Sequence, residues 1–195
     1  PARVFCLYFE EAMQAERYLW RHHSKVLPYE DLDFQMIGRR TALLKNCVAC
    51  FATVTNMSQP LVMAQKGLDD LSTGIQLVDD LVDWNDDFDS KIFTYPLVLC
   101  FQHLHKQNPA LLTPNEIEKI IVENGVADQV LYTAERYLFA GKRELESIGA
   151  QGMVTLTSQL LRSVNEMRAF LRTPGKLKGS LSVALKGRLD INLMH

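Results

Sequence analysis

An acidic helical stretch occupies residues 74–96, with the sequence GIQLVDDLVDWNDDFDSKIFTYP. Six aspartates fall within eleven positions of it: Asp79, Asp80, Asp83, Asp86, Asp87 and Asp89. Residues three and four apart share one face of an α-helix, and apolar residues fill most positions between them. The predicted polar stripe consists of Gln76, Asp79, Asp80 and Asp83. This stretch therefore predicts a packed helix with a carboxylate face.

Crowded carboxylates on such a face repel one another and raise each other's pKa. A hard divalent cation relieves that repulsion, and Mg²⁺ prefers carboxylate oxygens together with water and phosphate. The helix also uses Asp where Glu would be the better helix former. We therefore interpret Asp79, Asp80 and Asp83 as Mg²⁺ ligands, joined by Asp86 and Asp87 if the helix continues. A solvated acidic face is the alternative interpretation.

Size and charge narrow the class of protein. A chain of 195 residues with 47% hydrophobic content can bury the core of a single domain. Its net charge of −2 argues against nucleic acid as a partner. No apolar run reaches the roughly 20 residues that span a bilayer. Four cysteines without a framework spacing predict a reducing, cytoplasmic environment, with Cys47 and Cys50 as buried thiols.

Helical periodicity and short breaks extend to about residue 175. The predicted helices are 2–25, 29–57, 60–87, 96–107, 113–124, 126–147 and 152–172, with Thr113 and Glu116 forming a capping box. Short connections predict an all-α, mostly antiparallel bundle over residues 1–175. Residues 176–195 alternate apolar and polar positions, which leaves a small hairpin, a linker or a tail ordered by a partner open.

Basic residues accompany the acidic stretch. Arg39, Arg40 and Lys45 precede it on the helix predicted for 29–57, and Lys91 follows it. Cations beside a metal-binding acidic face are typical of a phosphate pocket, although each one alone would usually be a surface charge. His22 and His23 point about 100° apart on a helix, so we expect a solvated pair rather than ligands.

The segment 38–97 resembles a known family, the all-α class I isoprenoid synthases, and within it the trans-isoprenyl diphosphate synthases. Their second aspartate-rich motif has the form G-x-x-x-Q-x-x-D-D-x-x-D, which Gly74 and QLVDDLVD at 76–83 approach closely. Arg40-Thr41-Ala42 is similar to the Lys-Thr segment that contacts diphosphate in that family. The run DWNDDF followed by TYP also resembles bacterial members.

This resemblance implies an isoprenoid-synthase type of bundle that holds Mg²⁺ on the aspartates and takes an allylic prenyl diphosphate as substrate. Ionisation would be followed by prenyl transfer or by cyclisation. It implies diphosphate binding by Arg40, Lys45 and Lys91, and substrate contacts by Thr41 and Gln76. Trp84, Phe51 and Tyr95 are candidates for stabilising a carbocation, although a core position is the simpler interpretation of each.

The family also carries a first aspartate motif on an earlier helix. Neither Glu10-Glu11 nor the acidic segment 29–33 matches it, and several N-terminal helices of the family bundle have no counterpart here. One alternative is that the chain is the C-terminal portion of a longer protein; another is a reduced relative. A non-catalytic subunit or a helical interaction domain is the competing function. Association as a homodimer or with further helices stays open.

Overall fold

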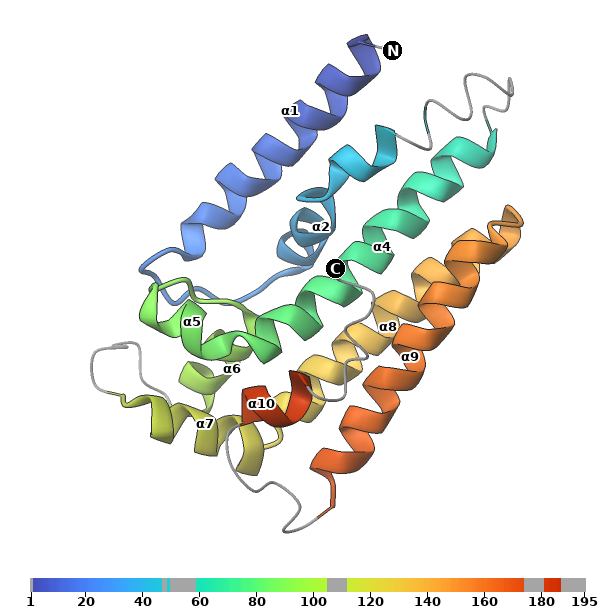
Figure 1. Cartoon of the computed structure of the whole chain (residues 1–195). Helices are drawn as coiled ribbons and strands as arrows, with labels where there is room; N and C mark the ends of the chain where they lie inside the picture. The colour runs from blue at the N-terminus through green and yellow to red at the C-terminus, as the bar shows by residue number, and fades with distance from the viewer. Residues whose placement is uncertain (1, 47–48, 50–58, 105–111, 174–180, 187–195) are drawn as a thin grey trace.

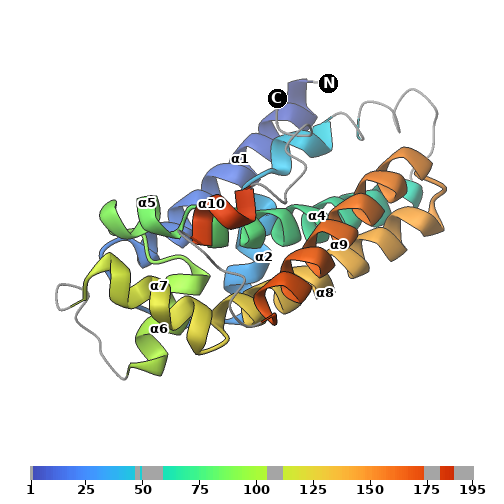
Figure 2. The ribbon, with the colours of Figure 1, turned by 60° about the horizontal axis from the view of Figure 1, so that its bottom comes forward.

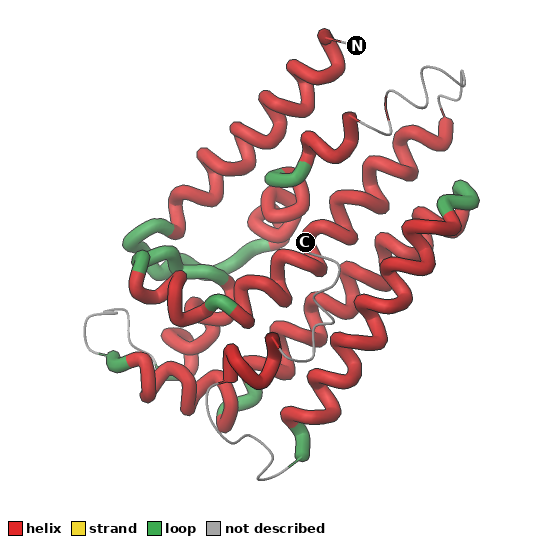
Figure 3. Tube along the Cα trace, viewed as in Figure 1, coloured by secondary structure: helices red, strands yellow, loops and turns green. Residues whose placement is uncertain are grey.

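The computed structural model describes residues 2–46, 49, 59–104, 112–173 and 181–186 (Figure 1). Within these ranges the chain is helical and contains no strand, which confirms the all-α class (Figure 3). The helices are α1 (Ala2–Leu19), η1 (Trp20–His22), α2 (Asp31–Arg39), η2 (Ala42–Leu44), α4 (Gln59–Val82), α5 (Trp84–Asp89), α6 (Tyr95–His103), α7 (Pro114–Glu123), α8 (Val126–Ser147), α9 (Gln151–Leu171) and α10 (Leu181–Lys186). None of these helices is long and apolar enough to cross a bilayer.

Five helices form the body of the bundle, and each packs on its neighbour in this series: α1, α2, α4, α8 and α9 (Figures 1 and 2). Of these, α4, α8 and α9 run in alternating directions (Figure 1), and the connection between α8 and α9 is short, whereas α5, α6 and α7 lie between α4 and α8 in the chain. The shorter α6 packs on α4, α7 and α8. Helix α10 lies against α4, although it comes last in the described chain (Figure 2).

The hydrophobic core lies around the C-terminal half of α4. Leu77 and Leu81 are fully buried there, as are Phe93, just before α6, and Leu97 and Phe101 within α6. Helix α8 covers the same core with Val130, Leu131 and Leu138 among other buried residues. The acidic stretch is thus anchored by its apolar face, which leaves its polar face at the edge of the core.

Glycines bring α4 and α8 into backbone contact. A Cβ added at Gly141 would lie 2.8 Å from the carbonyl oxygen of Gly67 and 2.9 Å from the amide nitrogen of Leu71. Both atoms belong to helical backbone and cannot move aside without displacing the helix. The glycine at 141 therefore sets the closest approach of α8 to the helix that carries the aspartates.

We expect Gly141→Ala to lower the free energy of unfolding by about 1–2 kcal/mol, because overpacking outweighs the gain of roughly 1 kcal/mol in helix propensity. Gly152 in α9 provides a matched control, since an added Cβ there meets nothing within 4 Å. Gly152→Ala should leave stability unchanged or raise it. Urea denaturation measures the free energy of unfolding of both variants. Equal changes in the two would show that the contact at Gly141 does not limit the packing of α8 on α4.

A short clasp joins the end of α1 to the segment after α5. His23 and Ile92 form an isolated antiparallel β-bridge. The amide of Ser24 donates to the carbonyl of Lys91 at 2.7 Å, and the amide of Phe93 donates to the carbonyl of His22 at 3.2 Å. Ser24 and Lys91 both have left-handed backbone, with φ of 60° and 58°. The helix predicted for 2–25 therefore ends earlier than expected, at Leu19 with one turn of 3₁₀ helix.

Other predicted boundaries also differ. The helix predicted for 29–57 ends at Arg39, and Thr41 adopts a turn conformation before η2. Residues 181–186 form helix α10, so the hairpin alternative is wrong for them. Cys47 and Cys50 lie outside the described residues. The helices predicted for 126–147 and 152–172 and the capping box of Thr113 with Glu116 are confirmed to within one residue.

Candidate functional site

The acidic stretch bends at Asp83, where the prediction of a continuous helix over 60–87 is wrong. Helix α4 ends at Val82, and Asp83 has φ of −101° and ψ of 16° as the N-cap of α5. The bend places Asp86 and Asp87 in the first turn of a new helix, where its dipole stabilises negative charge. Near the C-terminus of one continuous helix, the dipole would instead destabilise the same negative charges. Breaking the helix thus removes one cost of the acidic sequence.

Two aspartates on the last turns of α4 share a partner. Gln76 Nε2 donates to Asp79 Oδ2 at 3.1 Å and to Asp80 Oδ1 at 3.0 Å. Asp80 is only 6% exposed. Burial, followed by the charges of Asp87 and Asp79, raises its pKa to about 7, against the opposing effect of Gln76. Burial and the charge of Asp83 also raise the pKa of Asp79. Gln76 therefore holds two carboxyl groups that are costly to ionise.

Asp87, on α5, interacts electrostatically with Asp79 and Asp80. Thr94 Oγ1 donates to Asp87 Oδ2 at 3.1 Å, which fixes the carboxyl group. Burial, together with the charges of Asp83 and Asp79, raises the pKa of Asp87 to about 6. Asp86, in contrast, is exposed. The structure thus gathers Asp79, Asp80, Asp83 and Asp87 into one electrostatically coupled cluster and leaves Asp86 at its margin.

Arg40 is the basic residue, among those predicted from the sequence, that the structure brings to this cluster. Its charge lowers the pKa of Asp79, Asp80 and Asp87, and its Nε donates to Glu16 Oε1 at 2.8 Å. Arg40 and Asp80 line the same pocket of about 220 Å³, whose wall also includes Leu19, Tyr29 and Ile37. The pocket therefore combines a guanidinium and a carboxyl group with apolar surface.

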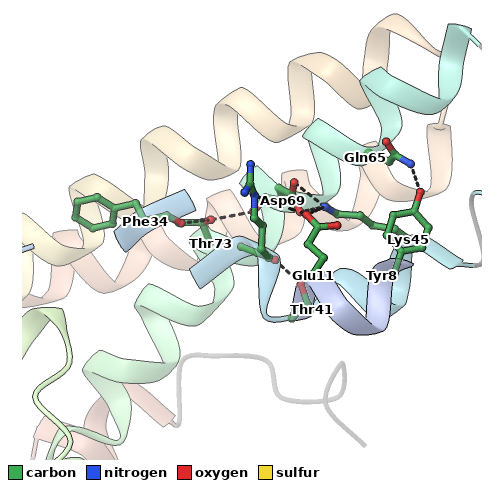
Figure 4. A network of polar contacts seen from close by, with 10 residues as sticks. Tyr8, Glu11, Phe34, Thr41, Lys45, Gln65, Asp69 and Thr73 are labelled. Atoms are coloured by element: carbon green, nitrogen blue, oxygen red, sulfur yellow. Dashed lines mark hydrogen bonds and ion pairs between the residues drawn. The ribbon is translucent and has the colours of Figure 1, made fainter. Parts of the chain in front are cut away.

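Lys45 lies in a different network, shown in Figure 4. It is buried, and its Nζ pairs with Asp69 Oδ1 at 2.7 Å and with Glu11 Oε1 at 2.9 Å. Gln65 and Tyr8 are hydrogen-bonded to each other beside it. The ammonium group thus joins α1 to α4 through two carboxylates and is engaged there. The structure does not bring Lys45 to the aspartates near Asp80.

Two predicted contacts remain, Thr41 and Lys91, and both take part in hydrogen bonds that involve the backbone. Thr41 Oγ1 donates to the carbonyl of Gly38 at 2.9 Å, which stabilises the turn after α2. Lys91 is exposed in the turn after α5, and its carbonyl accepts the Ser24 amide of the clasp. Among the ion pairs of the described residues, none joins Lys91 to an aspartate.

Sequence reasoning missed a buried polar group beside the pocket. His22 is 2% exposed, so the expectation of a solvated histidine pair is wrong for it. Its Nε2 lies 2.8 Å from Asp33 Oδ1, and Arg21 and the Glu30 amide donate to the same carboxylate. The His22 ring stacks on Tyr29 at 4.3 Å. The capping position of Asp33, three residues after Glu30 at the start of α2, was the available signal.

The aromatic candidates are core or near-core residues where the structure describes them. Trp84 is 3% exposed within the hydrophobic core. Tyr95 belongs to an aromatic group with Tyr29 and Phe34, with ring centroids 5.4 and 5.0 Å away. Phe51 lies outside the described residues. The core interpretation therefore accounts for Trp84 and Tyr95.

The donors suit Mg²⁺ in kind, although they do not form a protein cage. Within the described part of the chain, no three His, Cys, Asp or Glu side chains converge closely enough to hold a metal ion. Mg²⁺ is commonly held by one or two carboxylates together with water and substrate phosphates. Asp79, Asp80 and Asp87 supply such carboxylates beside Arg40. The residues therefore fit a cation held jointly with a diphosphate.

Comparison with known proteins adds no family to this description. No protein-family model matches the chain, and no curated protein or solved structure matches it either. The candidate site consequently rests on its own geometry: a coupled carboxylate cluster at the bend between α4 and α5, with Arg40 and an apolar pocket beside it.

Proposed function

We propose that this protein binds an allylic prenyl diphosphate through Mg²⁺ at the bend between α4 and α5, and promotes its ionisation for prenyl transfer or cyclisation. One observation carries the proposal. Asp80 is buried with its pKa raised to about 7, beside Asp79 and Asp87, whose pKa values are raised as well. A cluster that is costly to ionise is accounted for by a bound cation that neutralises it.

In this proposal Asp79, Asp80, Asp83 and Asp87 are the carboxylates available to Mg²⁺. When bound, the ion would supply positive charge to the departing pyrophosphate. Gln76 orients Asp79 and Asp80, and Thr94 orients Asp87. Arg40 contributes a further positive charge at the pocket, and Leu19 and Ile37 provide apolar surface that would exclude water from the hydrocarbon chain. We propose likewise that the helices form a bundle of the isoprenoid-synthase type.

Calorimetric titration of a non-hydrolysable thiolo analogue of farnesyl diphosphate tests it. We expect binding that requires Mg²⁺, and at least a tenfold loss of affinity in the double variant Asp79→Asn, Asp80→Asn, because cation binding loses two carboxylates. Asp89→Asn is the matched control, since Asp89 is exposed at the end of α5. Unchanged Mg²⁺-dependent binding in the double variant would rule out these ligands.

One observation favours the competing function, a non-catalytic helical subunit. Helix α1 exposes Phe5, Phe9 and Met13 at successive four-residue intervals, with exposed fractions of 53%, 48% and 40%. Such a row is typical of a helix face that contacts another protein. This function predicts no Mg²⁺-dependent binding of the diphosphate analogue, so the same titration separates the two proposals.

A further inference from the structure

Helix α10 brings a lysine to the acidic site from the far end of the chain. Lys186 Nζ lies 2.7 Å from Asp83 Oδ1. The hydrogen bond to Asp83 and the charges of Asp83, Asp86 and Asp79 raise the pKa of Lys186, and Lys186 in turn lowers the pKa of Asp79. A single ammonium group thus acts on three of the six aspartates of the acidic stretch. Neither the position of Lys186 in the sequence nor the residues next to it in the sequence predicted this contact with Asp83.

Helix α10 is held in place independently of this ion pair. Leu181 and Leu185 are fully buried and belong to the same hydrophobic core as Leu77 and Leu81. The amide of Leu181 donates to Glu118 of α7 at 2.5 Å. Lys186 is therefore delivered to Asp83 by an apolar anchor, and the helix can stay docked when the ammonium group moves away.

The ion pair itself is weak enough to exchange. The side chain of Lys186 is 49% exposed and that of Asp83 is 39% exposed. Half-exposed pairs contribute little to stability, because water screens them and the long lysine side chain is flexible. A divalent cation carries twice the charge of the ammonium group at the same carboxylate. It can therefore replace Lys186 at Asp83 without unfolding α10.

The pair also borders a pocket. A cavity of about 270 Å³ is lined by Lys186, Asp83, Asp86 and Glu118, together with Asn85 and Asn115. Its three carboxylates outnumber its single lysine, so a cation entering this pocket meets net negative charge. Lys186 lies on the wall of this pocket beside the acid that it neutralises.

We propose that Lys186 is a built-in counter-ion that occupies Asp83 in the metal-free protein and must leave it when a divalent cation binds. Helix α10 thereby regulates metal loading: the docked lysine weakens cation binding and neutralises Asp83 while no cation is bound. This inference rests on the proposed function, because it takes the aspartate cluster to be the cation site.

The test measures Mn²⁺ affinity by water-proton relaxation, without and with saturating inorganic pyrophosphate, in the full chain. Lys186→Gln should bind Mn²⁺ roughly tenfold more tightly than the parent protein, because one positive charge beside the cation is removed. Leu185→Ala weakens the apolar anchor and should tighten binding in the same direction. Lys186→Arg keeps the charge and should restore the parent affinity.

Lys66→Gln is the matched control for loss of charge. Lys66 pairs with Glu144, its side chain is 61% exposed, and it lies on the same helix as the aspartates. It is roughly 25 Å from Asp83 along α4 at 1.5 Å per residue, beyond the screening length of physiological salt. Lys66→Gln should bind Mn²⁺ like the parent protein.

The outcomes separate the two proposals. Tighter binding by Lys186→Gln but not by Lys66→Gln supports the counter-ion. Equal Mn²⁺ affinity in Lys186→Gln and the parent protein, in both conditions, would overturn the counter-ion and leave the proposed function standing. Absence of Mn²⁺ binding in every variant, with and without pyrophosphate, would overturn both.

Discussion

Asp80→Asn should stabilise the protein at pH 8 by up to about 4 kcal/mol and leave its stability at pH 4 nearly unchanged. The pKa of Asp80 in the folded protein is about 7, against an ordinary value of 3.8. The difference is roughly three pH units, and each unit corresponds to about 1.4 kcal/mol. Asparagine has nearly the same shape as the protonated acid, so it removes the cost of ionisation and keeps the packing.

The direction of this effect follows from proton binding. The folded protein holds the Asp80 proton more tightly than the unfolded chain does, so the contribution of Asp80 to stability is complete below pH 4. It is lost as the pH rises through about 7. Asp70, whose pKa is also raised, is not among the charges that act on Asp80, so its contribution is the same in both proteins and cancels in the comparison.

Urea denaturation of Asp80→Asn and the parent protein at pH 4, 6 and 8, without divalent cations, measures the difference directly. The gain in unfolding free energy should grow steadily with pH. Asp89→Asn should show no such growth, because Asp89 is exposed. A variant that is no more stable than the parent protein at pH 8 would mean that burial does not hold the pKa of Asp80 near 7.

Lys45→Met should destabilise the protein by about 3 kcal/mol at pH 7. Lys45 is 4% exposed, and its ammonium group pairs with both Asp69 and Glu11. Methionine keeps the apolar length of the side chain but leaves Asp69 without its ion-pair partner and Glu11 with only the more distant Arg39, at 3.6 Å. Burial already raises the pKa of Asp69 against the effect of Lys45, so the carboxylate is costly even when paired.

The expected loss is at the lower end of the range for buried pairs, because Asp69 and Glu11 keep about a quarter of their side-chain exposure. Chemical denaturation measures it. Lys142→Met is the matched control: Lys142 pairs with Glu146 at 3.3 Å within α8, and such a pair contributes less than about 0.5 kcal/mol. Equal losses of unfolding free energy in the two variants would show that the ion pairs of Lys45 do not stabilise the contact between α1 and α4.

Sequence periodicity predicted the helices well where local signals agree. Gly125 has left-handed backbone with φ of 76° directly before α8, and Thr113 caps α7 through its side chain. Both signals act within a few residues, so they can be read from the chain alone. Gln76, Asp79 and Asp80 lie within four residues of one another on a regular helix, which is why their shared face could also be predicted.

The rest of the site depends on contacts between distant segments. Lys45 and Arg40 lie on the same short stretch, and only tertiary packing turns one to Asp69 and the other towards Asp80. Lys186 reaches Asp83 because two leucines of α10 fit the core. Helix continuation and the helix dipole have effects of similar size, so the sequence alone does not predict the bend at Asp83.

The clasp between residues 22–24 and 91–93 has a consequence for the order of folding. Contacts between helices that follow one another in the chain, such as α8 with α9, form quickly because little loop entropy is lost. The β-bridge between His23 and Ile92, in contrast, closes a long loop that contains α2 and α4. We therefore expect the pocket wall that includes His22 and Ile92 to assemble after the helices that carry Asp80.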